Sequence, residues 1–199
     1  MIYNVKGILT YTDPTFAVVE CGGVGFKCFV SMTTLKELPS IGNEVNLYTY
    51  MSVREDALDL FGFFEVDELE AFKLLISVSG IGPKAAIAIL SVLTPSKLSI
   101  AVAGGDVRSI QAAQGVGKKT AERVVLELKD KMAGIGASAT EVQNIQSVAT
   151  SDNAQEAVEV LVSLGFNQSD AATVIGAMDK SLSVDDMVRK GLRQLSSQL

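Results

Sequence analysis

The stretch "GIGPKAAIAIL" (Gly80–Leu90) has a counterpart in "GVGKKTAERVV" (Gly115–Val125). Each places glycine, one apolar residue and a second glycine between two apolar patterns of helical period. An offset of 35 residues superposes them, aligning the glycines, one lysine and the apolar helix positions. Repetition at a fixed offset indicates two copies of one unit, a helix, a tight turn and a second helix.

The physical properties of glycine indicate what such a turn binds. Two flanking glycines allow positive φ and leave backbone N–H groups unshielded by side chains. The apolar residue between them, Ile81 or Val116, can plug between the helices. The free donors and the N-terminus of the next helix form an anion site. A plain helix C-cap is the alternative for one copy, but two copies in register, each followed by lysine, favour phosphate binding.

The second stretch also resembles a nucleotide-binding P-loop, which requires glycine, four residues, then glycine, lysine and serine or threonine. Ala112 stands where the first glycine belongs, and Lys119 stands where serine or threonine belongs. The sequence therefore does not predict a P-loop.

Charge is distributed unevenly along the chain. The 199 residues carry a net charge of −6. Residues 71–132 hold nine Lys or Arg against four Asp or Glu, a local balance of +5, so the remainder carries −11. This asymmetry predicts one nucleic-acid-facing segment in an otherwise acidic molecule.

The predicted fold class is α+β with several domains. Residues 1–64 read as about five short strands with one brief helix, which favours an oligonucleotide-binding (OB) barrel over a β-sandwich fragment. Residues 65–132 read as short helices separated by glycines and form the tandem hairpin domain. Residues 133–152 are small and polar, typical of a flexible linker, and residues 153–199 predict a three-helix bundle.

The composition gives no sign of catalysis. The chain has no histidine, metal-ligand cluster or nucleotide loop, so we expect no intrinsic catalytic site, no metal and no cofactor. An alternative is a general DNA-binding adaptor, or a Mg²⁺-dependent junction nuclease subunit using Glu55, Asp56 and Asp59. With no targeting or membrane-spanning pattern, we expect a soluble cytoplasmic protein.

The paired stretches resemble helix-hairpin-helix motifs, which contact DNA backbone phosphates without reading sequence. Together with "GGVGF", "TTLKELP" and "VREDALDLFGF", and with the order of barrel, paired hairpins, linker and three-helix module, the whole chain resembles the RuvA family. This family recognises Holliday junctions in bacterial DNA recombination, repair and the SOS response to DNA damage. The start "MIYNVKG" departs from the family, because it lacks an early arginine.

The resemblance implies roles for three sets of residues. Glu55 and Asp56 would form an acidic pin near the fourfold axis of a tetramer. The apolar face of the last module would dock a motor, through Leu161, Leu164, Val174 and Ile175. The hairpins would hold phosphates, through Gly80, Ile81, Gly82, Lys84, Gly115, Val116, Gly117, Lys118, Lys119 and Arg123.

The resemblance also implies partners. The protein would be the non-catalytic subunit of an ATP-dependent branch-migration helicase, and would bind four-way junction DNA selectively by shape. Its energy would come from the RuvB motor ATPase, and the RuvC resolvase would be a further partner. The expected assembly is a homotetramer, and the sequence leaves open whether one tetramer or two, an octamer, clasp the junction.

Overall fold

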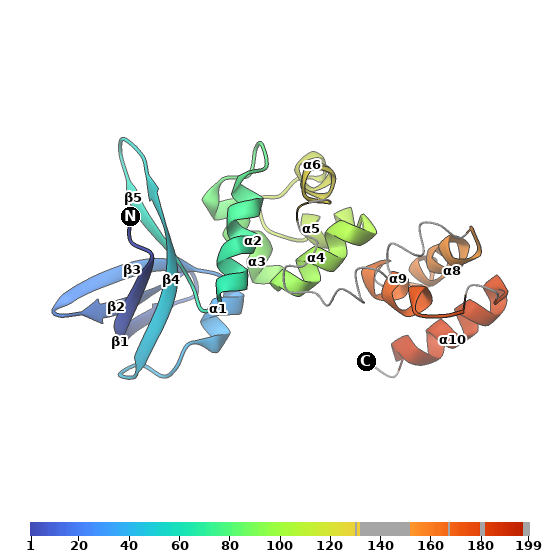
Figure 1. The fold of residues 1–199 in the computed structure, drawn as a ribbon, viewed down its shortest axis with the longest axis horizontal. Coiled ribbons are helices and arrows are strands. Elements are labelled where there is room, and N and C mark those ends of the chain that lie inside the picture. Colours follow the sequence, from blue (N-terminus) through green and yellow to red (C-terminus); the bar gives the residue numbers. More distant parts are fainter. Residues whose placement is uncertain (130, 132–151, 167, 180–181, 197–199) are drawn as a thin grey trace.

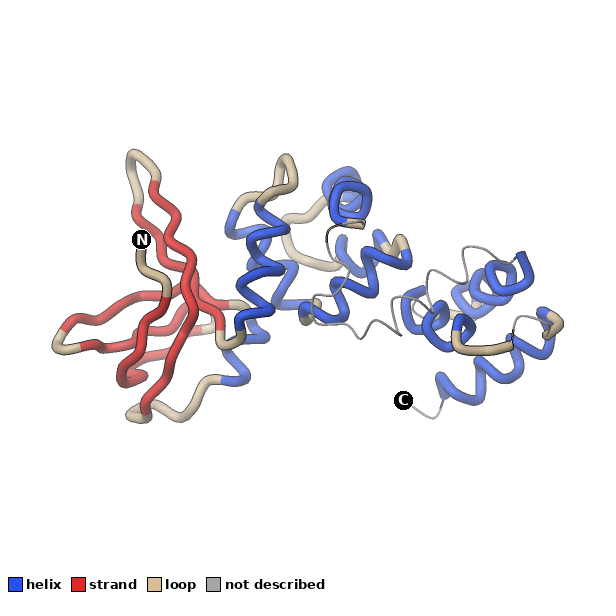
Figure 2. Tube along the Cα trace, viewed as in Figure 1, coloured by secondary structure: helices blue, strands red, loops and turns tan. Residues whose placement is uncertain are grey.

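The computed structural model describes residues 1–129, 131, 152–166, 168–179 and 182–196. Strands gather at one end of the molecule and helices at the other (Figure 2). The predicted linker lies outside the described residues, except for Asp152, which begins a helix. Three clusters of buried apolar side chains correspond to a barrel, a helical domain and a C-terminal bundle.

The N-terminal unit is a closed five-stranded barrel, as the strand pattern predicts. Its strands are β1 (Asn4–Asp13), β2 (Phe16–Cys21), β3 (Val24–Val30), β4 (Glu44–Val53) and β5 (Leu58–Phe63), in the order β1-β2-β3-β5-β4. A parallel pairing of β3 with β5 closes the barrel, and the other pairings are antiparallel. Helix α1 (Met32–Glu37) follows β3 and begins at Ser31, whose hydroxyl accepts from the Thr34 amide at 3.0 Å.

Five helices form the middle domain: α2 (Val66–Ile76), α3 (Pro83–Val92), α4 (Pro95–Gly104), α5 (Val107–Gln111) and α6 (Lys118–Leu128). Side chains cap two of these helices. Thr94 caps α4 through the Lys97 amide, and Asp106 caps α5 through the Ser109 amide. No single helix among the described residues is long and apolar enough to cross a membrane, and only α3 and α4 taken as a pair bent by 94° pass by length and composition.

The C-terminal module consists of α8 (Asp152–Ser163), α9 (Gln168–Gly176) and α10 (Val184–Ser196), the three helices that the sequence predicts. The Ser183 hydroxyl accepts from the Asp186 amide at 3.3 Å at the start of α10. Gly191 lets the helices approach closely, because a Cβ there would lie 2.9 Å from Leu161 Cδ1. The bundle is therefore small and tightly packed at this position.

One aromatic side chain joins the barrel to the helical domain. The Phe72 ring, on α2, lies 5.4 Å from the Phe61 ring, 4.9 Å from the Phe63 ring and 5.3 Å from the Tyr50 ring, centroid to centroid. Phe61 and Phe63 of β5 belong to the same buried cluster as the helices. The β4–β5 hairpin is thus held against α2 by shared aromatic packing.

A buried carboxylate forms a second link at the same junction. Glu68, on α2, is 2% exposed and accepts hydrogen bonds from the hydroxyls of Ser31 and Thr34. Thr34 Oγ1 in turn accepts from the Phe64 amide at 3.1 Å. Burial raises the pKa of the Glu68 carboxyl above its ordinary value of 4.5, while the two hydroxyl donors act in the opposite direction.

The raised pKa predicts a pH dependence of stability. The folded protein holds the Glu68 proton to a higher pH than the unfolded chain does. The resulting stabilisation is fully present below the unfolded value of 4.5 and is lost as pH rises through the folded pKa. We expect the free energy of unfolding of wild type, relative to Glu68→Gln, to fall over this window in urea titrations. Glu70→Gln, at an exposed site paired with Lys73, is the control, and parallel pH profiles for wild type and Glu68→Gln would contradict the prediction.

Candidate nucleic-acid interface

The two predicted turns share one backbone conformation. Gly80 has φ +88° and Gly115 has φ +79°, values that favour glycine. Ile81 is 5% exposed and Val116 is 6% exposed. Their amides donate inward, to the carbonyls of Val78 and Ala113 at 3.0 and 3.1 Å. The central apolar residues therefore plug the hairpins, as predicted, and set the turns without offering side chains to a ligand.

The second glycine of each turn has a different backbone conformation, and so a different structural role, from the first. We expected positive φ at both, but Gly82 has φ −90° and Gly117 has φ −79°, so that expectation is wrong for this pair. Both are N-cap residues, which adopt extended backbone as a helix begins. A Cβ at either position would meet nothing within 4 Å. Glycine here leaves open space in front of the helix.

The helices after these turns begin without a side-chain cap. The hydroxyls of Ser31 and Thr94 and the carboxylate of Asp106 cap α1, α4 and α5, whereas Gly82 and Gly117 make no side-chain cap bond to α3 and α6. Helix α2, after Glu65, also lacks one. First-turn amides have no partner within their helix. Because Gly82 and Gly117 have open space around them, the starts of α3 and α6 are accessible, a geometry that suits a phosphate oxygen.

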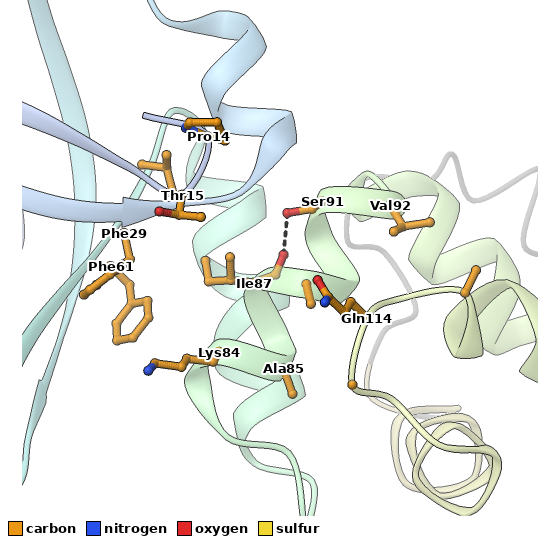
Figure 3. A pocket seen from close by; sticks show the side chains of 14 residues that line it. Pro14, Thr15, Phe29, Phe61, Lys84, Ala85, Ile87, Ser91, Val92 and Gln114 are labelled. Carbon is orange, nitrogen blue, oxygen red and sulfur yellow. Dashed lines mark hydrogen bonds between the residues drawn. The ribbon is translucent and has the colours of Figure 1, made fainter. Parts of the chain in front are cut away.

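Three lysines surround these helix starts. Lys84, Lys118 and Lys119 are all exposed. Lys118 lies 3.8 Å from Glu122, a loose pair on a solvated surface that holds the ammonium weakly. Lys84 projects into a groove between α3 and the barrel (Figure 3). The lysines add positive charge around the two uncapped helix starts.

Arg123 connects one hairpin to the other. Its Nη1 donates to the Ser79 carbonyl at 3.0 Å, 44 positions away along the chain, and lies 3.8 Å from the position of a Cβ on Gly80. Arg123 Nε also lies 3.9 Å from Glu127 Oε1, one helical turn further along α6. Sequence reasoning missed the contact with Ser79. This hydrogen bond ties the second hairpin to the first and so helps to fix the spacing between the two turns.

The acidic turn forms the tip of the β4–β5 hairpin. The Arg54 amide donates to the Ala57 carbonyl at 2.8 Å, and Arg54 Nη2 lies 2.6 Å from Asp59 Oδ2. Glu55 and Asp56 are exposed. Asp59 is held by Arg54, and the residues that the structure describes contain no group of three acids, cysteines or histidines placed to hold a metal. One of the three acids of the magnesium-dependent alternative, Asp59, is thus paired with a cation.

Comparison with known proteins covers nearly the whole chain. Residues 1–62 match the RuvA N-terminal domain, residues 72–130 a SAM-like helix-hairpin-helix tandem, and residues 152–196 the RuvA C-terminal domain. A protein of Desulforamulus reducens is 42% identical over 98% of both chains. Proteins of Acetivibrio thermocellus and Clostridium perfringens are 39% and 37% identical over 98% of this chain and 99% of their own. All three are named Holliday junction branch migration complex subunit RuvA.

The chain belongs to the RuvA family. Its OB-like barrel, tandem helix-hairpin-helix domain and C-terminal helical domain follow the family order. The glycine turns fall within the matched hairpin tandem, and the acidic turn falls within the matched N-terminal domain.

In the C-terminal module, the four predicted motor-binding residues fall into two groups. Leu161 and Ile175 are 0% and 1% exposed and form the bundle core. Leu164 is 57% exposed at the turn after α8, and Val174 is half-buried on α9. Phe166, half-buried beside Leu164, was not predicted. The sequence signal that could have identified Phe166 is an aromatic residue directly after Leu164 and Gly165, where glycine predicts a turn. The motor-binding role itself stays a prediction. Of the four residues, only Leu164 and Val174 are accessible enough to contact a motor.

The two glycines of each turn predict different mutant effects. Gly82→Val combined with Gly117→Val should lower the thermal unfolding midpoint only modestly, because both sites have negative φ and open space, although valine is a poorer N-cap than glycine. The new side chains should block phosphates and strongly weaken DNA binding in gel-shift titrations. Gly80→Ala should instead lower stability by about 1 kcal/mol, because its φ is positive. Unchanged DNA affinity of the folded double variant would refute phosphate binding at these helix starts.

The Arg123 contact predicts a positioning role, which the salt dependence of binding can separate from a phosphate contact. Arg123→Lys keeps the charge but loses the planar donor that reaches Ser79. We expect Arg123→Lys and Arg123→Ala to weaken DNA binding alike, with an unchanged slope of log affinity against log salt. Rescue by lysine, with a slope reduced by about 0.9 in the alanine variant, would mean that Arg123 contacts phosphate instead. Arg108→Ala, an exposed cation of α5, is the control.

Proposed function

We propose that this protein binds four-way DNA junctions by shape, without reading sequence, and presents them to a RuvB-type motor for branch migration. One observation carries the proposal: the acidic tip of the β4–β5 hairpin, the α2–α3 turn and α6 lie along one edge of the molecule (Figure 1). Backbone amides at uncapped helix starts suit phosphates of any sequence. The family membership supports the same role, that of a non-catalytic subunit which leaves ATP hydrolysis to the motor.

The apolar surface of α3 supports assembly into a homotetramer. Ala86, Ile89 and Leu90 are buried in the domain. The opposite side of the helix is also apolar, with Ile87 half-buried and Val92 49% exposed. These residues line a groove of about 790 Å³ with Phe29 and Phe61 of the barrel (Figure 3). An exposed apolar strip on a helix and the groove beside it suit a protein partner, and a neighbouring subunit is the cover we propose for Ile87 and Val92, with Lys84 at the edge of the strip.

A fourfold assembly gives the acidic turn a function. Four copies would bring eight carboxylates of Glu55 and Asp56 towards the axis, where the strands of a junction cross. Their repulsion would keep phosphates off the axis and direct the strands outward into the arms. Acids in this position lower affinity for continuous duplex more than for an open crossover, which makes them a source of selectivity.

The remaining partners follow from the same arrangement. The motor would dock on the accessible apolar residues of the C-terminal module, Leu164, Phe166 and Val174. A junction held by a single tetramer keeps its other face open, and we propose a RuvC-type resolvase as the partner on that face. The site of action would be the cytoplasm, where bacterial DNA is recombined.

Competition between a four-way junction and a duplex of matched length tests the proposed function. Gel-shift titrations at fixed salt give the two affinities, and native mass measurement of the same sample gives the number of subunits. The proposal expects a strong preference for the junction and a steep loss of affinity with salt. Equal affinity for the two DNAs would reduce the protein to a general DNA-binding adaptor.

The acidic turn predicts how that preference changes. Glu55→Gln combined with Asp56→Asn should tighten binding to duplex more than to junction, because the repulsion at the axis is removed. The ratio of duplex to junction affinity should rise severalfold. Glu44→Gln, which alters an exposed barrel acid paired with Lys6, serves as the control. An unchanged ratio, or weaker binding to both DNAs, would mean that the turn is only a solvated loop.

A further inference from the structure

The C-terminal module packs against the DNA-binding domain through α9 and α4 (Figure 1). Ile100 and Ala103, on α4, pack against the buried cluster of the module. Apolar side chains on α4 are therefore partly removed from water by α9 and its neighbours. The contact joins segments far apart in the sequence.

A hydrogen bond makes this contact specific. Gln168 Nε2, at the start of α9, donates to the Gly104 carbonyl at 3.1 Å. Gly104 ends α4, and the last carbonyls of a helix have no partner within it. The Gly105 and Asp106 amides bond the carbonyls of Val102 and Ala101. Gln168 thus gives a hydrogen bond to a carbonyl of the α4 terminus.

The side of α9 that meets α4 overlaps the proposed motor surface. Asp170 lines a cleft of about 260 Å³ together with Lys97 and Ile100 of α4. Val174 lies one helical turn beyond Asp170, on the same side of α9. The turn bearing Leu164 and Phe166 ends just before Gln168. A motor bound to Leu164, Phe166 and Val174 would compete with α4 for the space beside α9.

We propose that α4 is an internal docking seat for α9, and that the motor must displace it to bind the C-terminal module. This inference rests on the proposed function for the identity of the competing partner. The seat itself consists of Ile100, Ala103 and the Gly104 carbonyl. The cleft beside this contact stays open, and the Gln168 side chain that donates across it is exposed, so a partner can displace the contact.

Competition of this kind has a measurable consequence. The motor binds only molecules whose module has left α4, so its apparent dissociation constant is raised by the reciprocal of the undocked fraction. If about one molecule in five is undocked, removing the seat tightens apparent motor binding about fivefold. Junction binding is unaffected, because the seat contains none of the proposed phosphate-binding residues.

The test compares Ile100→Glu, which places a charge in the seat, with Val24→Glu, the same kind of change at an exposed barrel position. Gln168→Ala removes only the hydrogen bond from an exposed side chain, so it does not threaten the fold. Hydrogen exchange of the full-length protein alone reports on the seat. Both seat variants should lose amide protection in residues 100–104 and 168–176, and Val24→Glu should not.

Motor affinity is then measured with purified RuvB-type ATPase. We expect severalfold tighter binding for Ile100→Glu, a smaller gain for Gln168→Ala and none for Val24→Glu. Lost protection with unchanged or weaker motor binding would overturn the competition, and unchanged protection would overturn the seat. Failure of wild-type protein to bind the motor or the junction would instead count against the proposed function, while the exchange result would still decide the seat.

Discussion

The packing of Phe72 against three aromatic rings is the constraint on which the rest of the structure depends. The ring on α2 meets Phe61 and Phe63 on β5 and Tyr50 on β4. These strands carry the acidic turn at their far end, and α2 leads directly into the first glycine turn. The buried Glu68 network closes the same junction from the side of α1. The elements that we propose to repel and to attract DNA are consequently held at a fixed separation, which recognition by shape requires.

In each of the paired hairpins, the two glycines look equivalent in the sequence motif but have different structural roles. The first glycine supplies a backbone conformation that other residues adopt at a cost, whereas the second leaves space in front of an uncapped helix. The apolar residue between them is buried and anchors the turn. Because these features concern backbone and volume, the phosphate sites that we propose there would be independent of base identity. Arg123 then sets the distance between the two sites through the Ser79 carbonyl.

The sequence predicts local features well and tertiary contacts poorly. Strand alternation predicts the barrel, and the glycine repeat predicts both turns and their plugged residues, because each depends on neighbours within a few positions. The contacts of Arg123 with Ser79, Glu68 with Ser31 and Gln168 with Gly104 span 44, 37 and 64 positions. No local pattern encodes them. The same limit explains why Leu161 and Ile175 were assigned to a docking surface, since periodicity identifies an apolar face but does not say what covers it.

The charge distribution shows how an acidic protein can bind DNA at one edge only. A net charge of −6 repels a polyanion from most approaches, while the segment around the hairpins carries an excess of cations. At the proposed DNA-binding edge, the attraction would come from amide dipoles at two helix starts with three lysines nearby, and these act over short distances. Long-range repulsion and short-range attraction together disfavour loose, non-specific association more than a fully seated complex. A DNA that reaches both hairpins while avoiding the acidic tip therefore gains most, and a duplex that cannot bend away from the tip gains least.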